Sequence, residues 1–135
     1  MRLVVLAVGR LRPPFADDVQ HYRRLLARHA RLELIEVRED EGVERRLPER
    51  AFVSLLAADG QELDSVGLSR FLEERRQAGR DLWFVVGGPY GTDLPRADHR
   101  LSLGRLTLPH QLARVVLLEQ LYRAHKILAG EPYHH

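Results

Sequence analysis

The chain has 135 residues, 44% of them hydrophobic, a formal net charge of +2 at pH 7, and no cysteine. These values describe one globular domain that is large enough to bury a core, and they exclude disulfides and thiolate metal sites. The histidines are scattered without a ligand spacing, so we expect no metal site. No apolar run could span a bilayer and no leader is evident, so we expect a cytoplasmic protein without a membrane partner.

The basic residues are arginines, with Lys126 as the single lysine. Arginine forms forked contacts with phosphate, but a GC-rich genome also enriches it, so composition leaves a polyanion-binding face open. The stretch from Arg23 to Arg31 is either a solvated face or a phosphate contact. Six arginines crowd the first quarter of the chain: Arg10, Arg12, Arg23, Arg24, Arg28 and Arg31.

The first elements alternate between strand and helix. The continuous apolar run Leu3–Val8, bounded by glycine and prolines, predicts a strand buried on both faces. Apolar residues at helical spacing predict an amphipathic helix over Phe15–His29. Leu32–Val37 is a second strand, and the polar stretch Arg38–Arg50 is a connection or a short helical turn.

The alternation continues through the middle of the chain. Ala51–Ala57 is a third apolar strand, closed by Asp59–Gly60. A helix is predicted over Ser65–Ala78 and ends at Gly79, because glycine favours the left-handed position after a helix. Asp81–Val86 is the fourth strand.

A short fifth strand, Leu101–Leu103, precedes a final helix that starts with Pro109 in its first position and runs to Gly130. This order of elements predicts an α/β fold with a mostly parallel sheet flanked by helices. The final helix is apolar all round at Val115–Leu118, which indicates burial from more than one side and favours an interface with a second copy.

Glycines at predicted strand ends are the main chemical signal. The loop Gly87–Thr92 is neither a Walker A sequence nor a dinucleotide fingerprint, and alone it could be a structural turn. Asp59–Gly60 and Gly104–Arg105 also follow predicted strands, and parallel sheets bind ligands at the carboxyl ends of their strands. We therefore expect an apolar pocket that suits an adenosine-like ligand, with walls from Leu56, Leu103, Leu106 and Leu108.

Three stretches of the chain, VVGGPYG, SLGRLTLPHQLARVVLLEQLYRA and PYHH, resemble the RlmH (YbeA) family of SPOUT methyltransferases. The match is nearly continuous over Gly79–His135 and extends weakly to the amino terminus through LVVLAVGR and LELIEV. The resemblance implies a carboxy-terminal trefoil knot, which ordinary connection rules would not predict, and a homodimer. It also implies S-adenosylmethionine-dependent methylation of the N3 atom of a pseudouridine in 23S rRNA, on the assembled ribosome.

The resemblance assigns roles to particular residues. It implies that the tail of one subunit completes the active site beside the cofactor of the other. In this hypothesis His134 accepts a proton or orders a water that does. Tyr133 stacks on or hydrogen-bonds the base, and Arg114 and Arg123 face phosphate or carbonyl oxygen. The implied cofactor-binding residues are Leu56, Gly87, Leu103, Gly104, Arg105, Leu106, Thr107 and Leu108.

Some residues leave alternatives open. Tyr90 stands where the family usually has an acidic residue, and His135 where it has a basic one. Tyr90 favours a second hypothesis, a non-catalytic SPOUT-like dimer that binds RNA or the ribosome. His110 either packs at the start of a helix or takes part in the chemistry. The spacing of Glu119 and Arg123 also fits a pair that only stabilises the helix.

Overall fold

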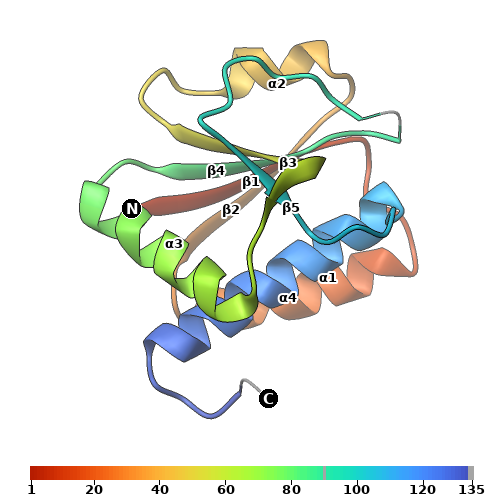
Figure 1. The fold of residues 1–135 in the computed structure, drawn as a ribbon. Coiled ribbons are helices and arrows are strands. Elements are labelled where there is room, and N and C mark those ends of the chain that lie inside the picture. The colour runs from red at the N-terminus through yellow and green to blue at the C-terminus, as the bar shows by residue number, and fades with distance from the viewer. Residues whose placement is uncertain (90, 134–135) are drawn as a thin grey trace.

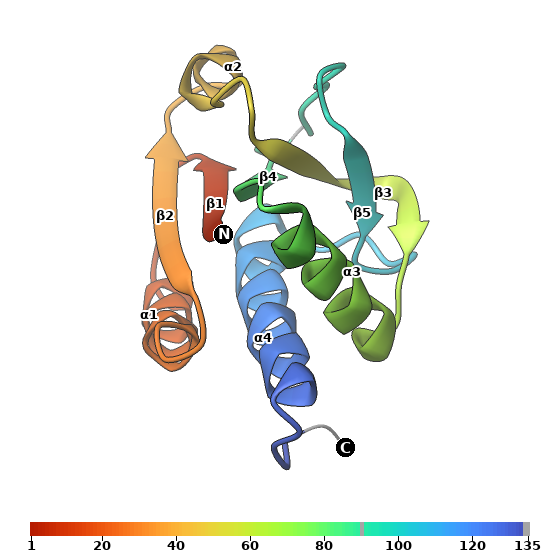
Figure 2. The ribbon, with the colours of Figure 1, turned by 90° about the vertical axis from the view of Figure 1, so that its left-hand side faces the viewer.

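The computed structural model describes residues 1–89 and 91–133 as a five-stranded parallel sheet with helices on both faces (Figures 1 and 2). The strand order is β2-β1-β4-β3-β5, and every pair of neighbours is parallel. The expected α/β fold is therefore confirmed. The strands are β1 (Arg2–Val8), β2 (Arg31–Val37), β3 (Phe52–Glu62), β4 (Leu82–Val86) and β5 (His99–Ser102).

The sheet separates two cores. Side chains of a strand alternate between its faces, so Leu3 and Val5 of β1 enter one core while Val4 and Leu6 enter the other. Strand β1 lies between β2 and β4 and is buried along nearly its whole length, which explains why its sequence is a continuous apolar run.

The helices are unequally divided between these cores. Figure 1 shows α1 (Phe15–Leu26), α3 (Ser65–Ala78) and α4 (His110–Leu128) together on one face of the sheet, with α2 (Glu41–Arg46) on the other. Helix α3 begins and ends as predicted, since the Asp64 side chain accepts a hydrogen bond from the Gly67 N–H and Gly79 adopts a left-handed φ of 79°. No helix in the described part of the chain is long and apolar enough to cross a membrane.

Several predicted boundaries need correction. Helix α1 ends at Leu26 and not at His29, because the chain leaves it through a tight turn in which the His29 N–H donates to the Leu26 carbonyl. The polar connection after β2 does contain a helical segment, α2. Pro109 caps α4 from outside with an extended ψ of 139°, so the helix begins one residue later than predicted.

Strand β3 is longer than predicted. It continues through Asp59–Gly60 to Glu62, with a register shift against β5 between Leu56 and Gln61. A Cβ atom on Gly60 would lie 2.7 Å from the carbonyl carbon of Arg100, so the glycine permits close pairing with β5. The prediction that Asp59–Gly60 ends a strand beside a ligand is therefore wrong.

Candidate active site

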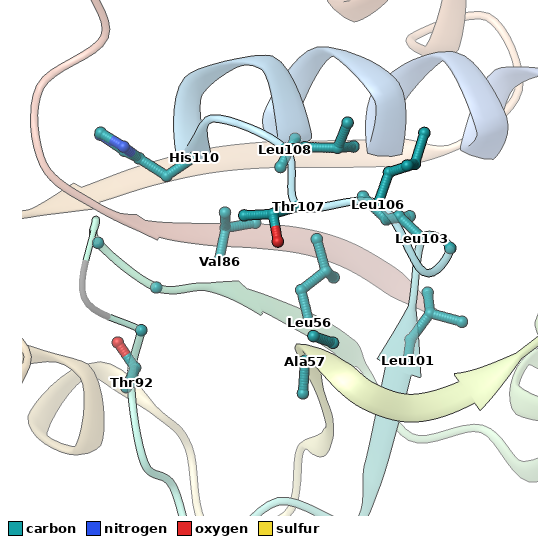
Figure 3. A pocket seen from close by; sticks show the side chains of 16 residues that line it. Leu56, Ala57, Val86, Thr92, Leu101, Leu103, Leu106, Thr107, Leu108 and His110 are labelled. Carbon is teal, nitrogen blue, oxygen red and sulfur yellow. The ribbon is translucent and has the colours of Figure 1, made fainter.

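A cavity of about 180 Å³ opens at the carboxyl edge of the sheet (Figure 3). Because the strands are parallel, β4 and β5 both end on this edge, residues 56–58 of the longer β3 lie beside it, and the segment 103–108 that joins β5 to α4 closes it. Figure 3 shows Leu56 of β3 and Thr107 of the joining segment pointing toward one another across the cavity.

Residues far apart in the sequence meet here. All the predicted cofactor-binding residues line the cavity except Arg105, which is exposed outside it. The cavity also includes residues that sequence reasoning had not assigned to it. Ala58 and Ala113 carry no chemical signal, and only the folded chain brings them to the edge of the sheet.

Glycines let the main chain approach the cavity closely. A Cβ atom on Gly87 would lie 2.6 Å from Thr92 Oγ1, so no other residue fits without moving the loop after β4. Gly104 has a φ of 128°, a conformation that residues with a Cβ atom rarely adopt. Gly87 therefore lets the loop after β4 fold closely against Thr92, and Gly104 leaves open space, and the main chain of both lines the cavity.

The lining suits the adenosine part of S-adenosylmethionine. Leucines from β3, β5 and the joining segment supply apolar surface for a flat ring, and main-chain N–H and C=O groups supply polar contacts. His110 is the one titratable side chain among the described residues that line the cavity. No group of three or more His, Asp or Glu in the described part of the chain is arranged to hold a metal ion.

His110 lies at the rim of the cavity, on the first residue of α4. Burial lowers its pKa below the usual value for histidine, and the positive charges of Arg114 and Arg12 lower the pKa further. The ring is therefore neutral at pH 7 and can accept a hydrogen bond or a proton.

An Arg12→Gln substitution is expected to raise the pKa of His110, because it removes a neighbouring positive charge. A titration of the histidine resonances by NMR measures the change. In the wild-type protein the folded state holds this proton less tightly than the unfolded chain, so the free energy of unfolding falls as the pH drops through the histidine range. An Arg24→Gln variant, altered on α1 and not in the loop before it, serves as the control. Identical His110 titrations in wild type and Arg12→Gln would contradict the assigned proximity.

Arg114 is buried and bound within the chain. Its exposed fraction is 4%, and its guanidinium donates to the carbonyl oxygens of Val8 and Gly9 at 3.1 and 2.6 Å. It also pairs with Glu36 at 2.8 Å. These contacts give Arg114 a positioning role for the loop after β1, while its contact with a substrate stays a prediction.

An Arg114→Met substitution is expected to lower the free energy of unfolding by about 2–4 kcal/mol, because two main-chain carbonyls and a carboxylate lose a charged partner. Chemical denaturation measures the loss. Exposed Arg24→Met is the control, with an expected change within about 0.5 kcal/mol. Equal stability of the two variants would show that the buried contacts contribute nothing.

The beginning of the tail packs on the side of α4. The Tyr133 hydroxyl donates to Glu119 at 3.0 Å, and Glu119 pairs with Arg123 at 2.8 Å. The Arg123 guanidinium lies 4.8 Å from the centre of the Tyr133 ring, and Tyr122 meets that ring edge-on. Burial and the bond to Glu119 raise the pKa of Tyr133 to about 12, so its hydroxyl stays protonated and acts as a donor.

This Tyr133 cluster (Glu119, Tyr122, Arg123 and Tyr133) is separate from the cavity, and none of its members lines it. Glu119 follows His110 by nine residues, which is about 14 Å of helix. Within one chain, the structure therefore brings the predicted cofactor residues other than Arg105 together but does not bring Tyr133 to them. His134, His135 and Tyr90 lie outside the described residues.

The fold and the site define an α/β protein with a small-molecule cavity at the carboxyl edge of a parallel sheet. A family model described as "Predicted SPOUT methyltransferase" matches residues 1–134. The chain belongs to this family and, within it, to the RlmH group, as its sequence had indicated.

Three relatives illustrate the match, each named "Ribosomal RNA large subunit methyltransferase H". The protein from Rubrobacter xylanophilus is 46% identical, with 98% of each chain covered. Those from Gemmatimonas aurantiaca and Pelobacter propionicus are both 40% identical, with 99% and 100% of each chain covered. The similarity therefore extends over nearly the whole length of this chain and of each relative.

Proposed function

We propose that this chain uses S-adenosylmethionine to methylate the N3 atom of a pseudouridine in 23S rRNA, on the assembled ribosome. The observation that carries the proposal is the cavity itself. All the residues that the family resemblance assigns to the cofactor, except Arg105, line it, in a chain that the family model matches over residues 1–134. The names of the relatives support large-subunit rRNA as the substrate, and a ribosomal substrate implies action in the cytoplasm.

The cofactor would be held by the strand ends and the joining segment. Leu56, Leu103 and Leu108 would enclose its base, and the main chain near Gly87 and Gly104 would contact its polar groups. Arg105 would meet it or the RNA from outside the cavity. When bound, S-adenosylmethionine supplies a methyl group on a sulfonium that is open to in-line displacement, so correct positioning provides much of the acceleration.

Residues of this chain would accept the proton that leaves the N3 atom and position the nucleobase. The N3–H of the base must lose its proton before or during attack on the methyl group, and His134 is the proposed acceptor. Tyr133 keeps its own proton. It would stack on the nucleobase, or donate a hydrogen bond to it in exchange for the present bond to Glu119. Arg123 lies beside Tyr133 and would supply positive charge for a phosphate or carbonyl oxygen. Arg114 would do the same if it gave up its present bonds to Glu36 and the main chain.

A homodimer with a carboxy-terminal knot completes the proposal. Three features support a second copy: Leu106 at the cavity is 83% exposed, Val115 and Val116 of α4 are only partly buried, and the Tyr133 cluster lies away from the cavity of its own chain. Membership of the family supports the knot.

Mapping of modified nucleotides tests the proposed reaction. Large-subunit rRNA from cells that lack this protein should carry one methyl group fewer by mass spectrometry, at a pseudouridine, and the purified protein with S-adenosylmethionine should restore it. An unchanged set of methyl groups would contradict the enzyme. Cofactor binding by calorimetry, without any methyl transfer, would favour the non-catalytic RNA-binding dimer.

A further inference from the structure

We propose that the loop between β1 and α1, residues 9–14, holds the phosphate backbone of the RNA at the mouth of the cavity through Arg10 and Arg12. The inference rests on the proposed function, since it takes the RNA substrate as given, and it adds where that RNA is held. Figure 3 shows this segment of the chain passing beside His110 at the rim.

Two side chains of α4 fasten the loop. Gln111 is buried, and its amide contacts the loop main chain twice: the oxygen accepts the Arg12 N–H at 2.8 Å and the nitrogen donates to the Arg10 carbonyl at 2.7 Å. Arg114 holds the carbonyl of Gly9 at 2.6 Å. Because these bonds occupy the main chain on both sides of the arginine side chains, the loop is fixed before any ligand arrives.

The two arginine side chains take no part in these bonds. Arg10 and Arg12 are exposed, and neither side chain forms a hydrogen bond or an ion pair with any described residue. Some exposed arginines are paired, such as Arg76 with Glu73 and Arg100 with Asp59, whereas others, such as Arg24 and Arg28, are exposed and unpaired like Arg10 and Arg12. The fixed main chain beside the cavity therefore distinguishes Arg10 and Arg12, and exposure alone does not. A rigid main chain that presents two uncompensated guanidinium groups is suited to an anionic partner, and guanidinium matches the geometry of phosphate.

The loop adjoins the cavity without lining it. A Cβ atom on Gly9 would lie 4.0 Å from His110 Nε2, and the charge of Arg12 reaches the same ring. Neither Arg10 nor Arg12 is among the lining residues. A ligand held by them therefore lies outside the cofactor cavity, where the backbone next to an inserted base would pass, and phosphate contacts fix the register of such a base.

The arginines of α1 offer a matched comparison. Arg24 and Arg28 are also exposed, but they lie at and beyond the far end of α1, which starts beside the loop and runs away from it (Figure 1). Replacing Arg24 and Arg28 lowers the net charge of the protein by the same amount as replacing Arg10 and Arg12. A difference between the two pairs therefore reports position and not total charge.

The test measures binding to large ribosomal subunits purified from cells that lack this protein, as a function of salt concentration. The double variant Arg10→Gln/Arg12→Gln should bind about tenfold more weakly, and its plot of log K against log salt should be less steep by about 1.5. Its affinity for S-adenosylmethionine should stay at the wild-type value. The double variant Arg24→Gln/Arg28→Gln should keep the wild-type salt slope, because we take the stretch from Arg23 to Arg31 as a solvated face and not as a phosphate contact.

Each other result overturns the inference. Equal losses in the two double variants would mean that only total charge matters, and wild-type binding by Arg10→Gln/Arg12→Gln would show that the loop does not contact the RNA. A selective loss of cofactor affinity would place the cofactor carboxylate at these arginines. If the wild-type protein neither binds nor methylates the subunits, that result contradicts the proposed function itself, and with it this inference.

Discussion

A Gly87→Val substitution is expected to weaken the binding of S-adenosylmethionine by roughly tenfold to a hundredfold. The first added atom would lie 2.6 Å from Thr92 Oγ1 and 2.9 Å from the Thr92 nitrogen. Thr92 is itself held by Asp40, to which its hydroxyl donates at 2.8 Å, so it cannot move without losing that bond. The loop after β4 must therefore shift at the wall of the cavity, and a loss of about 1.4–2.8 kcal/mol in binding free energy corresponds to a tenfold to hundredfold loss of affinity. Calorimetry with the cofactor measures the effect.

The control separates lost affinity from lost stability. Val43 of α2 is fully buried in the core on the opposite face of the sheet, and it does not line the cavity. Val43→Ala should therefore lower the free energy of unfolding but leave cofactor affinity unchanged. Wild-type affinity in Gly87→Val would show that the ligand does not use the space beside this glycine.

Much of the sheet was predictable because its physical cause is local. A strand buried on both faces needs apolar residues throughout, and the runs that became β1 and β4 are apolar throughout. The extension of β3 was not predictable in this way. Asp59–Gly60 carries a turn signal, but pairing with β5, some forty residues further along the chain, overrides it. Strand pairing between distant segments cannot be predicted from the local sequence of either segment.

The candidate site likewise has a part that could be predicted from the sequence and a part that could not. The glycines and leucines of the cavity lie within β3 and β5 or directly after β4 and β5, and parallel strands run toward one edge, so their meeting could be predicted from the sequence. The partners of Arg114 could not, because Glu36 and Gly9 are 78 and 105 residues away along the chain. The fastened loop with Arg10 and Arg12 was equally hidden, since only the fold shows that Gln111 holds it.

A His134→Ala substitution is expected to lower the rate of methyl transfer by about a hundredfold to ten-thousandfold, the usual effect of losing a general base. Cofactor affinity should not change, because the proposed role of His134 is only to accept the N3 proton of the pseudouridine. Single-turnover transfer of labelled methyl groups to ribosomes that lack the modification measures the rate. Near-normal turnover would remove His134 from the mechanism.

Mixing two inactive variants tests whether the tail acts on a second copy. Tyr133 is held by Glu119 on its own α4, and the Tyr133 cluster does not line the cavity of its own chain. If tail and cavity come from different subunits, a mixed dimer of Gly87→Val and His134→Ala chains contains one intact pair. Random exchange should then restore about a quarter of wild-type activity at cofactor concentrations too low to fill the Gly87→Val cavity. If each tail served its own cavity, no mixed dimer would contain an intact site, and the mixture would remain inactive.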